Sequence, residues 1–457
     1  MIQFGRKSCG LTAALALLAT APAAAQQAQG PPAGDVPFET FRLENGLRVI
    51  LAPERTTPVV SVNVWYDVGS RNERPGRTGF AHLFEHMMFQ GSQNIGKTEH
   101  MQLVERAGGS LNGTTSEDRT NYFQTLPSNR LNLGLWLEAD RMRSLAVTKE
   151  NFENQREVVK EERRMRVENQ PYVGSVLTAL YEAPYNAEGC FGYAHNVIGS
   201  MDDLNAARVE DVQQFFDTYY RPNNATLTIS GDFDPAEARQ LVQQYFADIP
   251  NGGAPPAFTC TSPFTGLPER QTINDANANL PALSMVFGVP EAKHADAYAL
   301  ELLSAILLDG ESSRLNQRLV KQEKAALAVQ SLSSNRRGPG LFGMLAIANQ
   351  GVAAERLEKL LSEEVEKVVR NGVSAAELQK AKNRQRAQTV RSRQTVHGRA
   401  EALQWFVHFH GDPAALRDDL ARYDAVTRDD VRRVAQQYLT PSNRAVIVTQ
   451  PGPAAKE

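Results

Sequence analysis

The order of apolar and polar residues divides the first part of the chain into short strands and longer helices. Two apolar runs, 38–42 and 47–51, flank Asn45-Gly46, a pair typical of β-hairpin turns, and the run 59–68 predicts a third strand. Apolar residues at helical spacing predict helices at 79–90, 98–107, 129–143 and 149–167. Because strands and helices do not alternate regularly, the pattern favours an α+β fold with helices packed on a largely antiparallel sheet.

A second feature is an internal repeat. The stretch DVQQFFDTYYRPNNATLTI, starting at Asp211, resembles DVRRVAQQYLTPSNRAVIV, starting at Asp430, so the offset is 430 − 211 = 219 residues. The same offset relates Tyr219 to Tyr438. Both stretches predict a helix, a proline stop and a β-branched strand. Similarity at a fixed offset indicates two homologous domains rather than a coincidence of common patterns.

The boundary between the repeats is marked by composition. Residues 250–266, PNGGAPPAFTCTSPFTG, are rich in Pro, Gly, Ser and Thr, which is typical of a linker. We therefore predict an N-terminal domain at 36–250, a linker at 251–270 and a C-terminal domain at 271–452. Each domain is expected to be a largely antiparallel sheet packed with helices.

Composition and charge narrow the class of protein. The 457 residues are 42% hydrophobic and 22% charged, as in soluble globular proteins, and they are too many for one ordinary core. The formal net charge of -3 and the lack of a basic cluster argue against a nucleic-acid partner.

The first 25 residues have the layout of a secretory signal peptide. Arg6 and Lys7 precede an apolar run at 11–18 and a small-residue tail that ends at Ala25. We expect cleavage near Ala25 and a periplasmic or secreted mature protein. This apolar run is too short to span a bilayer, and nowhere else does the sequence have about 18 uninterrupted apolar residues. The mature chain is therefore expected to have no membrane span.

Two cysteines would remain in the mature chain. Cys190 and Cys260 would share a compartment that permits disulfides. The sequence leaves open whether they pair or are two separate buried thiols, because it does not give the distance between them.

The stretch AHLFEHMMFQGS at 81–92 sets polar residues into an apolar run. On a helix, the Leu, Phe and Met side chains gather on one side, while His82, Glu85 and His86 occupy the other. Two imidazoles one turn apart suit a tetrahedral zinc ion, and Glu85 could take a proton from zinc-activated water as general base. We predict one zinc ion per chain. The alternative is a chance HLFEH sequence on a solvated helix face.

A third zinc ligand is expected from another helix. Residues 154–166 offer Glu157, Glu161 and Glu162. Helical phase favours Glu162, which points near the centre of an apolar stripe, where a carboxylate is costly unless a cation meets it. Gln155 lies on the same stripe and could hydrogen-bond a metal ligand. The alternative is an exposed charged helix on which Glu162 is merely solvated. The stripe is defined by Phe152, Val158, Val159 and Met165.

These motifs resemble the inverted-zinc-motif peptidases, the pitrilysin family that includes the mitochondrial processing peptidase. The matching text is GFAHLFEHMMFQGS at 79–92, GGSLNGTTSEDRTNYF at 108–123 and QREVVKEE at 155–162. The resemblance implies a zinc-dependent endopeptidase acting on peptides or unfolded polypeptide segments. It assigns His82, His86 and Glu162 as metal ligands and Glu85 as the catalytic base, in agreement with the choice made from helical phase.

The resemblance also implies how substrate binds. Family members add the peptide as a strand to an edge strand that contains an Asn-Ala pair, matched here by Asn112 and Gly113. The alternative is that the Asn-Gly pair is a turn. Glycine in place of alanine predicts a more flexible edge. Gln155 replaces a glutamate that is common in the family, so its hydrogen bond is retained without the charge.

A further departure concerns the second half. Active relatives carry an Arg and a Tyr there, and our alignment places Val320 and Leu327 at those positions. Neither side chain can donate a hydrogen bond to a developing oxyanion. Some bacterial relatives divide the zinc motif and the Arg/Tyr pair between two chains. We therefore expect a heterodimer with a homologous partner subunit that carries the Arg/Tyr pair, the two chains enclosing a chamber for peptides.

The repeat offset gives an independent view of the second half. Adding 219 to His82, Glu85 and His86 leads to Glu301, Ser304 and Ala305, so the C-terminal domain is expected to be non-catalytic. The rival to the peptidase hypothesis is a non-catalytic scaffold or peptide-binding subunit of a heteromeric complex. Retention of all four site residues favours the enzyme.

Overall fold

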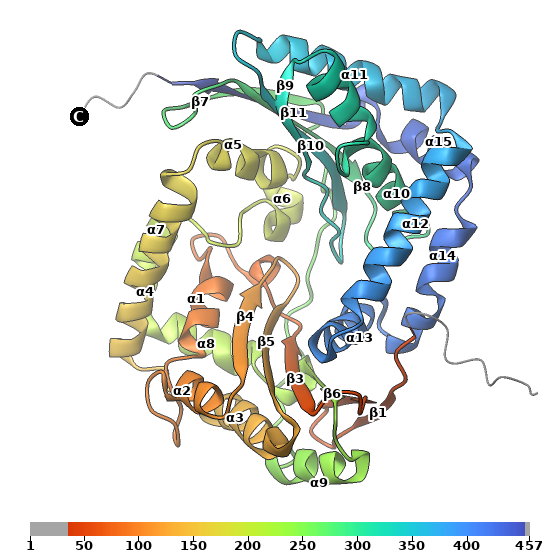
Figure 1. The fold of residues 1–457 in the computed structure, drawn as a ribbon. Coiled ribbons are helices and arrows are strands. Elements are labelled where there is room, and N and C mark those ends of the chain that lie inside the picture. The colour runs from red at the N-terminus through yellow and green to blue at the C-terminus, as the bar shows by residue number, and fades with distance from the viewer. Residues whose placement is uncertain (1–34, 453–457) are drawn as a thin grey trace, which may run out of the picture.

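The structure, a computed structural model, describes residues 35–452 and contains one β-sheet in each half of the chain (Figure 1). In the first sheet, β2 and β6 are parallel and all other neighbours are antiparallel. Gly46, with φ of +92°, makes the predicted turn between β1 and β2. In spatial order the strands are β1 (Glu39–Arg42), β2 (Arg48–Pro53), β6 (Ala225–Gly231), β3 (Val59–Tyr66), β5 (Thr120–Pro127) and β4 (Ser110–Thr115).

The second sheet repeats the first sheet without its β1. Its single parallel pair, β7 and β11, corresponds to β2 and β6, and the remaining neighbours are again antiparallel. The same strand order in both halves agrees with the predicted duplication. In spatial order the strands are β7 (Glu269–Asp275), β11 (Arg444–Pro451), β8 (Ala282–Val289), β10 (Gly340–Ala348) and β9 (Ala326–Ser331).

Helices complete the α+β fold that the sequence predicted. In the first half they are α1 (Phe80–Met87), α2 (Glu99–Arg106), α3 (Leu131–Ser144), α4 (Lys149–Arg163), α5 (Val173–Leu177), α6 (Ala187–Cys190), α7 (Met201–Ala206), α8 (Val209–Tyr219) and α9 (Pro235–Phe246). In the second half they are α10 (Ala297–Leu308), α11 (Ala354–Asn371), α12 (Ala375–Ser392), α13 (Val396–His410), α14 (Asp419–Ala425) and α15 (Arg428–Tyr438).

Each sheet has one face covered by its own half and the other face covered by the opposite half. Helix α13 of the second half lies against β3 and β6 (Figure 1), and its Leu403 and Phe406 share a buried cluster with Ile50 of the neighbouring β2. Reciprocally, Ala179 of the first half packs on Ile447 of the second sheet. The offset of 219 relates the two covering segments, since 396 − 219 = 177. Full burial of Leu403 or Phe406 stabilises the fold by roughly 1.5–3 kcal/mol each, so the halves support one another.

The predicted linker region crosses between the halves without regular structure. Residues 250–266 form neither helix nor strand, and Cys260 within them is disulfide-bonded to Cys190. The pairing that the sequence left open is therefore present in the structure. The exact domain boundaries, 36–250 and 271–452, stay a prediction.

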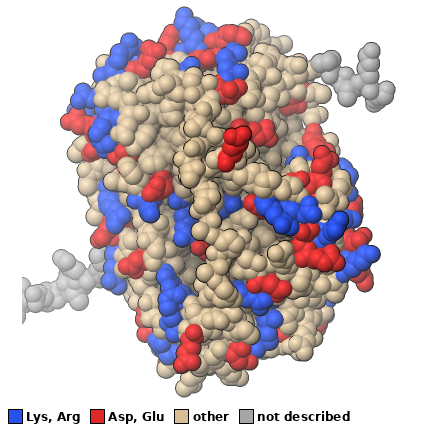
Figure 2. Space-filling model, turned by 180° about the vertical axis from the view of Figure 1, so that it is seen from behind, with Lys and Arg blue, Asp and Glu red and all other residues tan. Residues whose placement is uncertain are grey.

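Surface and helix properties bear on possible partners. Acidic and basic side chains are interspersed over the face shown in Figure 2. No helix within residues 35–452 has the length and apolar character needed to cross a bilayer. The predicted signal peptide lies outside the described residues.

Candidate metal centre

Helix α1 carries the HLFEH motif, and its first turn is fixed by groups from outside the helix. Gly79 precedes it with φ of +86°, and a Cβ there would lie 2.6 Å from the Ile198 carbonyl oxygen, so glycine is required. The Glu73 carboxylate accepts hydrogen bonds from the backbone N–H groups of Gly79 (2.9 Å) and Ala81 (2.7 Å). These bonds satisfy N–H groups that have no partner inside the helix. Because α1 is anchored at this end, its polar side is held in a defined orientation.

The structure brings the three predicted metal ligands together. His82 and His86 lie one turn apart on α1, and Glu162 projects from the last turn of α4. Glu162 Oε2 is 3.7 Å from His82 Nε2 and 3.3 Å from His86 Nε2. One potential ligand atom from each residue lies within 4.8 Å of the other two, and no other such group of three occurs in residues 35–452. The ligands of a tetrahedral zinc ion at about 2.1 Å lie roughly 3.4 Å apart, so the spacing fits zinc.

The apolar stripe predicted on α4 is buried only in part. Phe152 and Val159 are buried as predicted, but Val158 is 43% exposed and Met165 53% exposed. The buried side of α4 instead runs through Phe152, Gln155, Val159 and toward Glu162. Single exposed apolar side chains are common on protein surfaces, so Val158 and Met165 were poor markers of the buried side.

Groups around the ligands differ between the two histidines. His86 Nδ1 lies 3.3 Å from Gln155 Oε1, an arrangement that orients the ring and leaves Nε2 facing Glu162. His82 Nδ1 is buried and has no hydrogen-bond partner among the described residues. Arg166, which is exposed, pairs with the second oxygen of Glu162 at 2.9 Å.

Two of the three ligands, His82 and Glu162, favour the protonation state that binds a cation. Burial and the neighbouring His86 lower the pKa of His82 to about 4, so its imidazole is neutral at pH 7. The contact with His86 lowers the pKa of Glu162, which favours the ionised carboxylate. Burial acts to lower the pKa of His86, but Glu162 outweighs it and raises that pKa. A metal ion bound to His86 would displace the proton from its ring and would be attracted by the Glu162 carboxylate in its place.

Glu85 lies beside the ligands and contacts the edge strand of the sheet. Its Oε2 accepts a 2.5 Å hydrogen bond from the Thr115 hydroxyl on β4. Burial raises the pKa of Glu85, while this hydrogen bond and His86 act in the opposite direction. Sequence reasoning missed Thr115 and Glu73. Thr115 stood in the quoted stretch 108–123, whereas nothing in the sequence connects Glu73 with α1.

The proposed substrate-binding residues lie on β4, which is an edge strand, so the turn alternative for them is wrong. Asn112 is exposed, and Gly113 is buried. A Cβ on Gly113 would lie 3.1 Å from the Tyr122 ring and 3.2 Å from Glu85 Cγ. Strand β4 therefore passes close to Glu85 at this position, and the greater flexibility expected of the glycine stays a prediction.

The described part of the second half, up to residue 452, has no comparable group of ligands. Val320 packs against the hydrophobic core of the second half, and Leu327 on β9 is 54% exposed. Glu301, at the position equivalent to His82, accepts a hydrogen bond from Asn335 Nδ2 at 2.5 Å. These side chains are consistent with a structural role.

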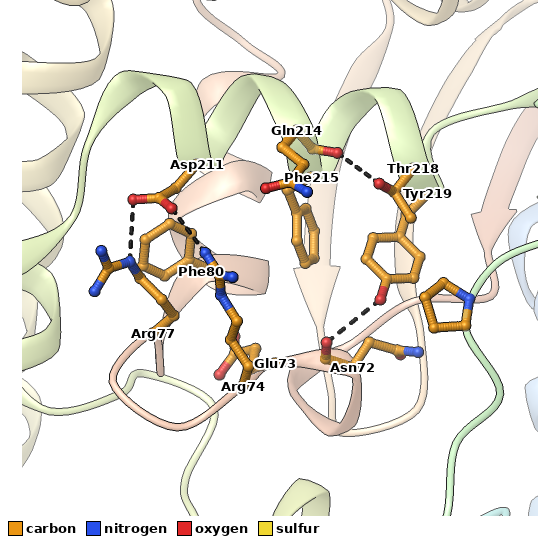
Figure 3. Close-up of a pocket in the computed structure, with 11 residues that line it drawn as sticks. Asn72, Glu73, Arg74, Arg77, Phe80, Asp211, Gln214, Phe215, Thr218 and Tyr219 are labelled. Carbon is orange, nitrogen blue, oxygen red and sulfur yellow. Dashed lines mark hydrogen bonds and ion pairs between the residues drawn. The ribbon is translucent and has the colours of Figure 1, made fainter.

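A cavity of about 320 Å³ lies behind α1, away from the metal ligands. Figure 3 shows its wall on α8, where Asp211 pairs with Arg74 and Arg77 at 3.0 Å each. The ring of Phe80, the first residue of α1, also lines it. None of His82, Glu85, His86 and Glu162 contributes to this lining, so the cavity is separate from the candidate centre.

Comparison with known proteins identifies the family. Residues 48–191 match the family described as insulinase (peptidase family M16), and residues 206–385 match the peptidase M16 inactive domain. The zinc protease PqqE of Helicobacter pylori is 31% identical over 420 residues, which cover 90% of this chain and 93% of that protein. The chain belongs to peptidase family M16. The expected resemblance is confirmed.

Further M16 relatives and structures agree with this assignment. The mitochondrial-processing peptidase subunit beta of Blastocladiella emersonii is 24% identical, with 90% of this chain and 88% of that protein covered. The crystal structure of a protease from Helicobacter pylori superposes with a TM-score of 0.85 at 30% identity, covering 91% of this chain and all (100%) of that one. The periplasmic protease PqqL of Escherichia coli shares the fold with a TM-score of 0.72 at 20% identity, over 91% of this chain and 48% of that one.

Proposed function

We propose that this M16 chain is a zinc-dependent endopeptidase that hydrolyses peptides or unfolded polypeptide segments. The observation that carries the proposal is the spacing of His82, His86 and Glu162, with Oε2 of Glu162 lying 3.3 and 3.7 Å from the two imidazole nitrogens. Two imidazoles and one carboxylate are a ligand set typical of catalytic zinc, which leaves one position open. Relatives named zinc proteases support the same reading.

In this proposal His82, His86 and Glu162 hold one zinc ion, and Gln155 keeps the His86 ring in place. When bound, zinc lowers the pKa of water and polarises a carbonyl group. Glu85 accepts the proton from the attacking water as general base and passes it to the leaving amine. The Thr115 hydroxyl holds the Glu85 carboxylate toward the site through its 2.5 Å hydrogen bond.

The substrate is proposed to bind along β4. This strand is at the edge of the first sheet, so one side of its backbone is free to pair with an added peptide strand. Asn112 and Gly113 lie on it, and Gly113 directly neighbours Glu85. Main-chain pairing would tolerate varied side chains, as expected for an enzyme that acts on unfolded segments.

A homologous partner subunit is part of the proposal. Val320 and Leu327 offer no hydrogen-bond donor where active relatives have an Arg and a Tyr. A partner that carries this pair would supply the missing stabilisation of the oxyanion, which is worth a few kcal/mol. The relative from Blastocladiella emersonii is itself named as a subunit.

The alternative function is a non-catalytic scaffold or peptide-binding subunit. The match of residues 206–385 to the inactive domain of the family favours such a role for the second half. The four site residues of the first half favour the enzyme for the chain as a whole. We further propose a periplasmic or secreted location after cleavage near Ala25, supported by the periplasmic relative in Escherichia coli.

The test measures bound zinc and hydrolysis of fluorescein-labelled casein, with and without a candidate partner. Glu85→Gln should retain zinc and lose about 10²–10⁴-fold in kcat. Glu162→Ala should lose both zinc and hydrolysis. Glu161→Gln, next to it on α4 and 56% exposed, is the matched control and should behave as wild type. Full turnover by Glu85→Gln would remove this residue from the mechanism, and wild-type protein without zinc or hydrolysis would favour the scaffold.

A further inference from the structure

The tips of two equivalent β-hairpins meet where the halves of the chain join. The β4–β5 tip, residues 116–119, carries Glu117 and Asp118, and the β9–β10 tip, residues 332–339, carries Arg336 and Arg337. The repeat offset relates these pairs, since 336 − 117 = 219 and 337 − 118 = 219. Arg336 Nη2 lies 3.2 Å from Glu117 Oε1, and the Arg337 N–H donates to Asp118 Oδ2 at 2.9 Å. Equivalent positions of the two repeats therefore contact each other, and the Arg336–Glu117 contact joins opposite charges.

Arg336 is buried in a site built by the first half. Its side chain is 1% exposed, and its guanidinium lies 5.0, 4.6 and 4.9 Å from the ring centroids of Tyr181, Tyr185 and Tyr193. Glu117 also accepts a hydrogen bond from the Tyr181 hydroxyl at 2.8 Å. A buried charge is costly unless it is paired and hydrogen-bonded. Because the aromatic rings and the carboxylate come from the first half, Arg336 ties the second half to it.

Asp118 is the second fixed point of the contact. Its side chain is 3% exposed, and Oδ1 accepts hydrogen bonds from Arg71 at 2.8 Å and the Tyr193 hydroxyl at 2.6 Å. Oδ2 accepts the backbone bond from Arg337. All of these donors lie outside the β4–β5 hairpin, so the hairpin tip is held from both halves of the chain.

The acidic tip leads directly to the candidate catalytic centre. Strand β4 ends at Thr115, two residues before Glu117, and the Thr115 hydroxyl contacts Glu85. Arg119, the last residue of the tip, donates from Nη1 to the Thr114 carbonyl of β4 at 2.9 Å. Displacement of the tip would therefore move the edge strand against Glu85.

We infer that Arg336 is a positioning residue for the peptidase site: through Glu117 it fixes the β4–β5 hairpin, and with it the edge strand beside Glu85. This inference rests on the proposed function. It gives the second half, which lacks metal ligands, a task in the reaction. Opposite charges at equivalent tips also favour closure of one half on the other, whereas two identical tips would repel.

The experiment compares Arg336→Gln and Arg336→Lys with the control Arg337→Gln, whose side chain is 41% exposed. The readouts are zinc content, hydrogen exchange of residues 110–127, and KM and kcat for fluorescein-labelled casein. Arg336→Gln should keep zinc, exchange about tenfold faster in 110–127, and raise KM about tenfold with a smaller change in kcat. Arg336→Lys should be intermediate because it keeps the charge without the planar fork. Arg337→Gln loses an exposed ion pair between Arg337 Nη1 and Asp67 (2.6 Å) but keeps the backbone N–H that reaches Asp118. It should therefore change KM and exchange in 110–127 far less than Arg336→Gln does.

Faster exchange confined to residues 332–345, or equal loss of zinc and structure throughout, would overturn the inference. If Arg336→Gln does not fold, Glu117→Gln removes the same pair from the first half and is measured in its place. Where both single variants fold, the double variant should be no worse than either single one, and additive effects would argue against coupling. If the wild type does not hydrolyse casein, the proposed function fails, while zinc content and exchange still decide whether Arg336 holds the edge strand.

Discussion

Helix α1 and its counterpart α10 occupy equivalent places on the two sheets, yet they hold different chemistry. Where α1 has His82, α10 has Glu301, whose carboxylate bonds to Asn335 and Tyr423 within the second half. Where α1 has Glu85, α10 has Ser304, which lies 3.2 Å from the Ser331 hydroxyl. The same scaffold thus supports a candidate metal centre in one half and a hydrogen-bonded structural network in the other.

The difference extends to the helix that supplies the third ligand. The offset relates Glu162 on α4 to Ala381 on α12. Ala381 is 5% exposed and belongs to the hydrophobic core of the second half. Packing of helices on the sheet therefore requires none of the four site residues. The comparison teaches that the fold is set by apolar faces and that the chemistry depends on a few polar positions set into them.

The largest effect is expected when the first half is given the residue of the second. His82→Glu replaces an imidazole by a carboxylate beside Glu162, and without two imidazoles zinc content should fall below ~0.1 per chain. Casein hydrolysis should fall at least about 10²-fold. Metal analysis and activity measure both outcomes. The reverse change, Glu301→His, should add no second zinc ion, because Ser304 and Ala305 provide no further ligand; a second bound ion would contradict the comparison.

A smaller effect is expected from the group behind His86. Gln155→Ala removes the oxygen that lies 3.3 Å from His86 Nδ1 and should weaken zinc affinity by about 10–100-fold without unfolding the protein. Competition with a chelator measures the affinity. Glu153→Ala, whose side chain is 49% exposed on the same helix, is the control. Unchanged affinity in Gln155→Ala would show that the ring is held by other contacts.

In the second half, removing a hydrogen bond to Glu301, the counterpart of His82, should lower stability without changing the zinc content. Tyr423→Phe removes the hydroxyl that donates to Glu301, and burial already raises the pKa of this carboxyl group. We expect the free energy of unfolding to fall by about 1–3 kcal/mol with zinc content unchanged. Denaturant titration measures the loss. Tyr438→Phe, whose hydroxyl donates to Asp296, should have a smaller effect, because Arg433 still pairs with that carboxylate at 2.6 Å. Zinc loss in either variant would contradict the division of roles.

The smallest effect is expected at a partly exposed ion pair of the second half, between Arg314 and Glu377. The Arg314 guanidinium, bonded to Glu377 at 2.6 and 2.8 Å, lowers the pKa of that carboxyl group from 4.5 to about 2. A lowered folded-state pKa gives stability that is present above pH 4.5 and lost as the pH falls toward 2. Because the two side chains are still 21% and 32% exposed, water screens the pair in part, and Glu377→Gln should cost about 1 kcal/mol at pH 7. Denaturation at pH 7 and pH 3 should show that cost shrinking, and a constant cost would exclude the ion pair as its cause.

Local patterns were sufficient for the elements around the site. The HLFEH spacing put His82, Glu85 and His86 on one side of a helix, and the structure begins α1 at Phe80, one residue from the predicted start. The end of that helix was placed three residues too late, at 90 instead of Met87, because caps are weak signals in an apolar run. Helical phase predicts Glu162 as the third ligand even though Val158 and Met165 are exposed in the structure. The buried Phe152 and Val159 are sufficient to mark the side of the helix on which Glu162 lies.

Contacts between distant segments were beyond such patterns. The anchoring of α1 by Glu73, the bond between Thr115 and Glu85, and the pairing of Cys190 with Cys260 each join residues whose nearness depends on the packed fold. The exchange of covering segments between the halves belongs to the same class. Its sequence trace, the offset of 219, indicates two equivalent segments but not which sheet each one covers.

The sequence by itself determined the repeat, the helices and strands, and the residue types able to bind a metal ion, because periodicity and side-chain chemistry are local properties. Only the tertiary structure decided that Glu162 reaches both histidines, that β4 is an edge strand beside Glu85, and that Arg336 is buried against Glu117. The physical reason is that burial, desolvation and ion pairing depend on which segments share a space, and packing alone sets that arrangement.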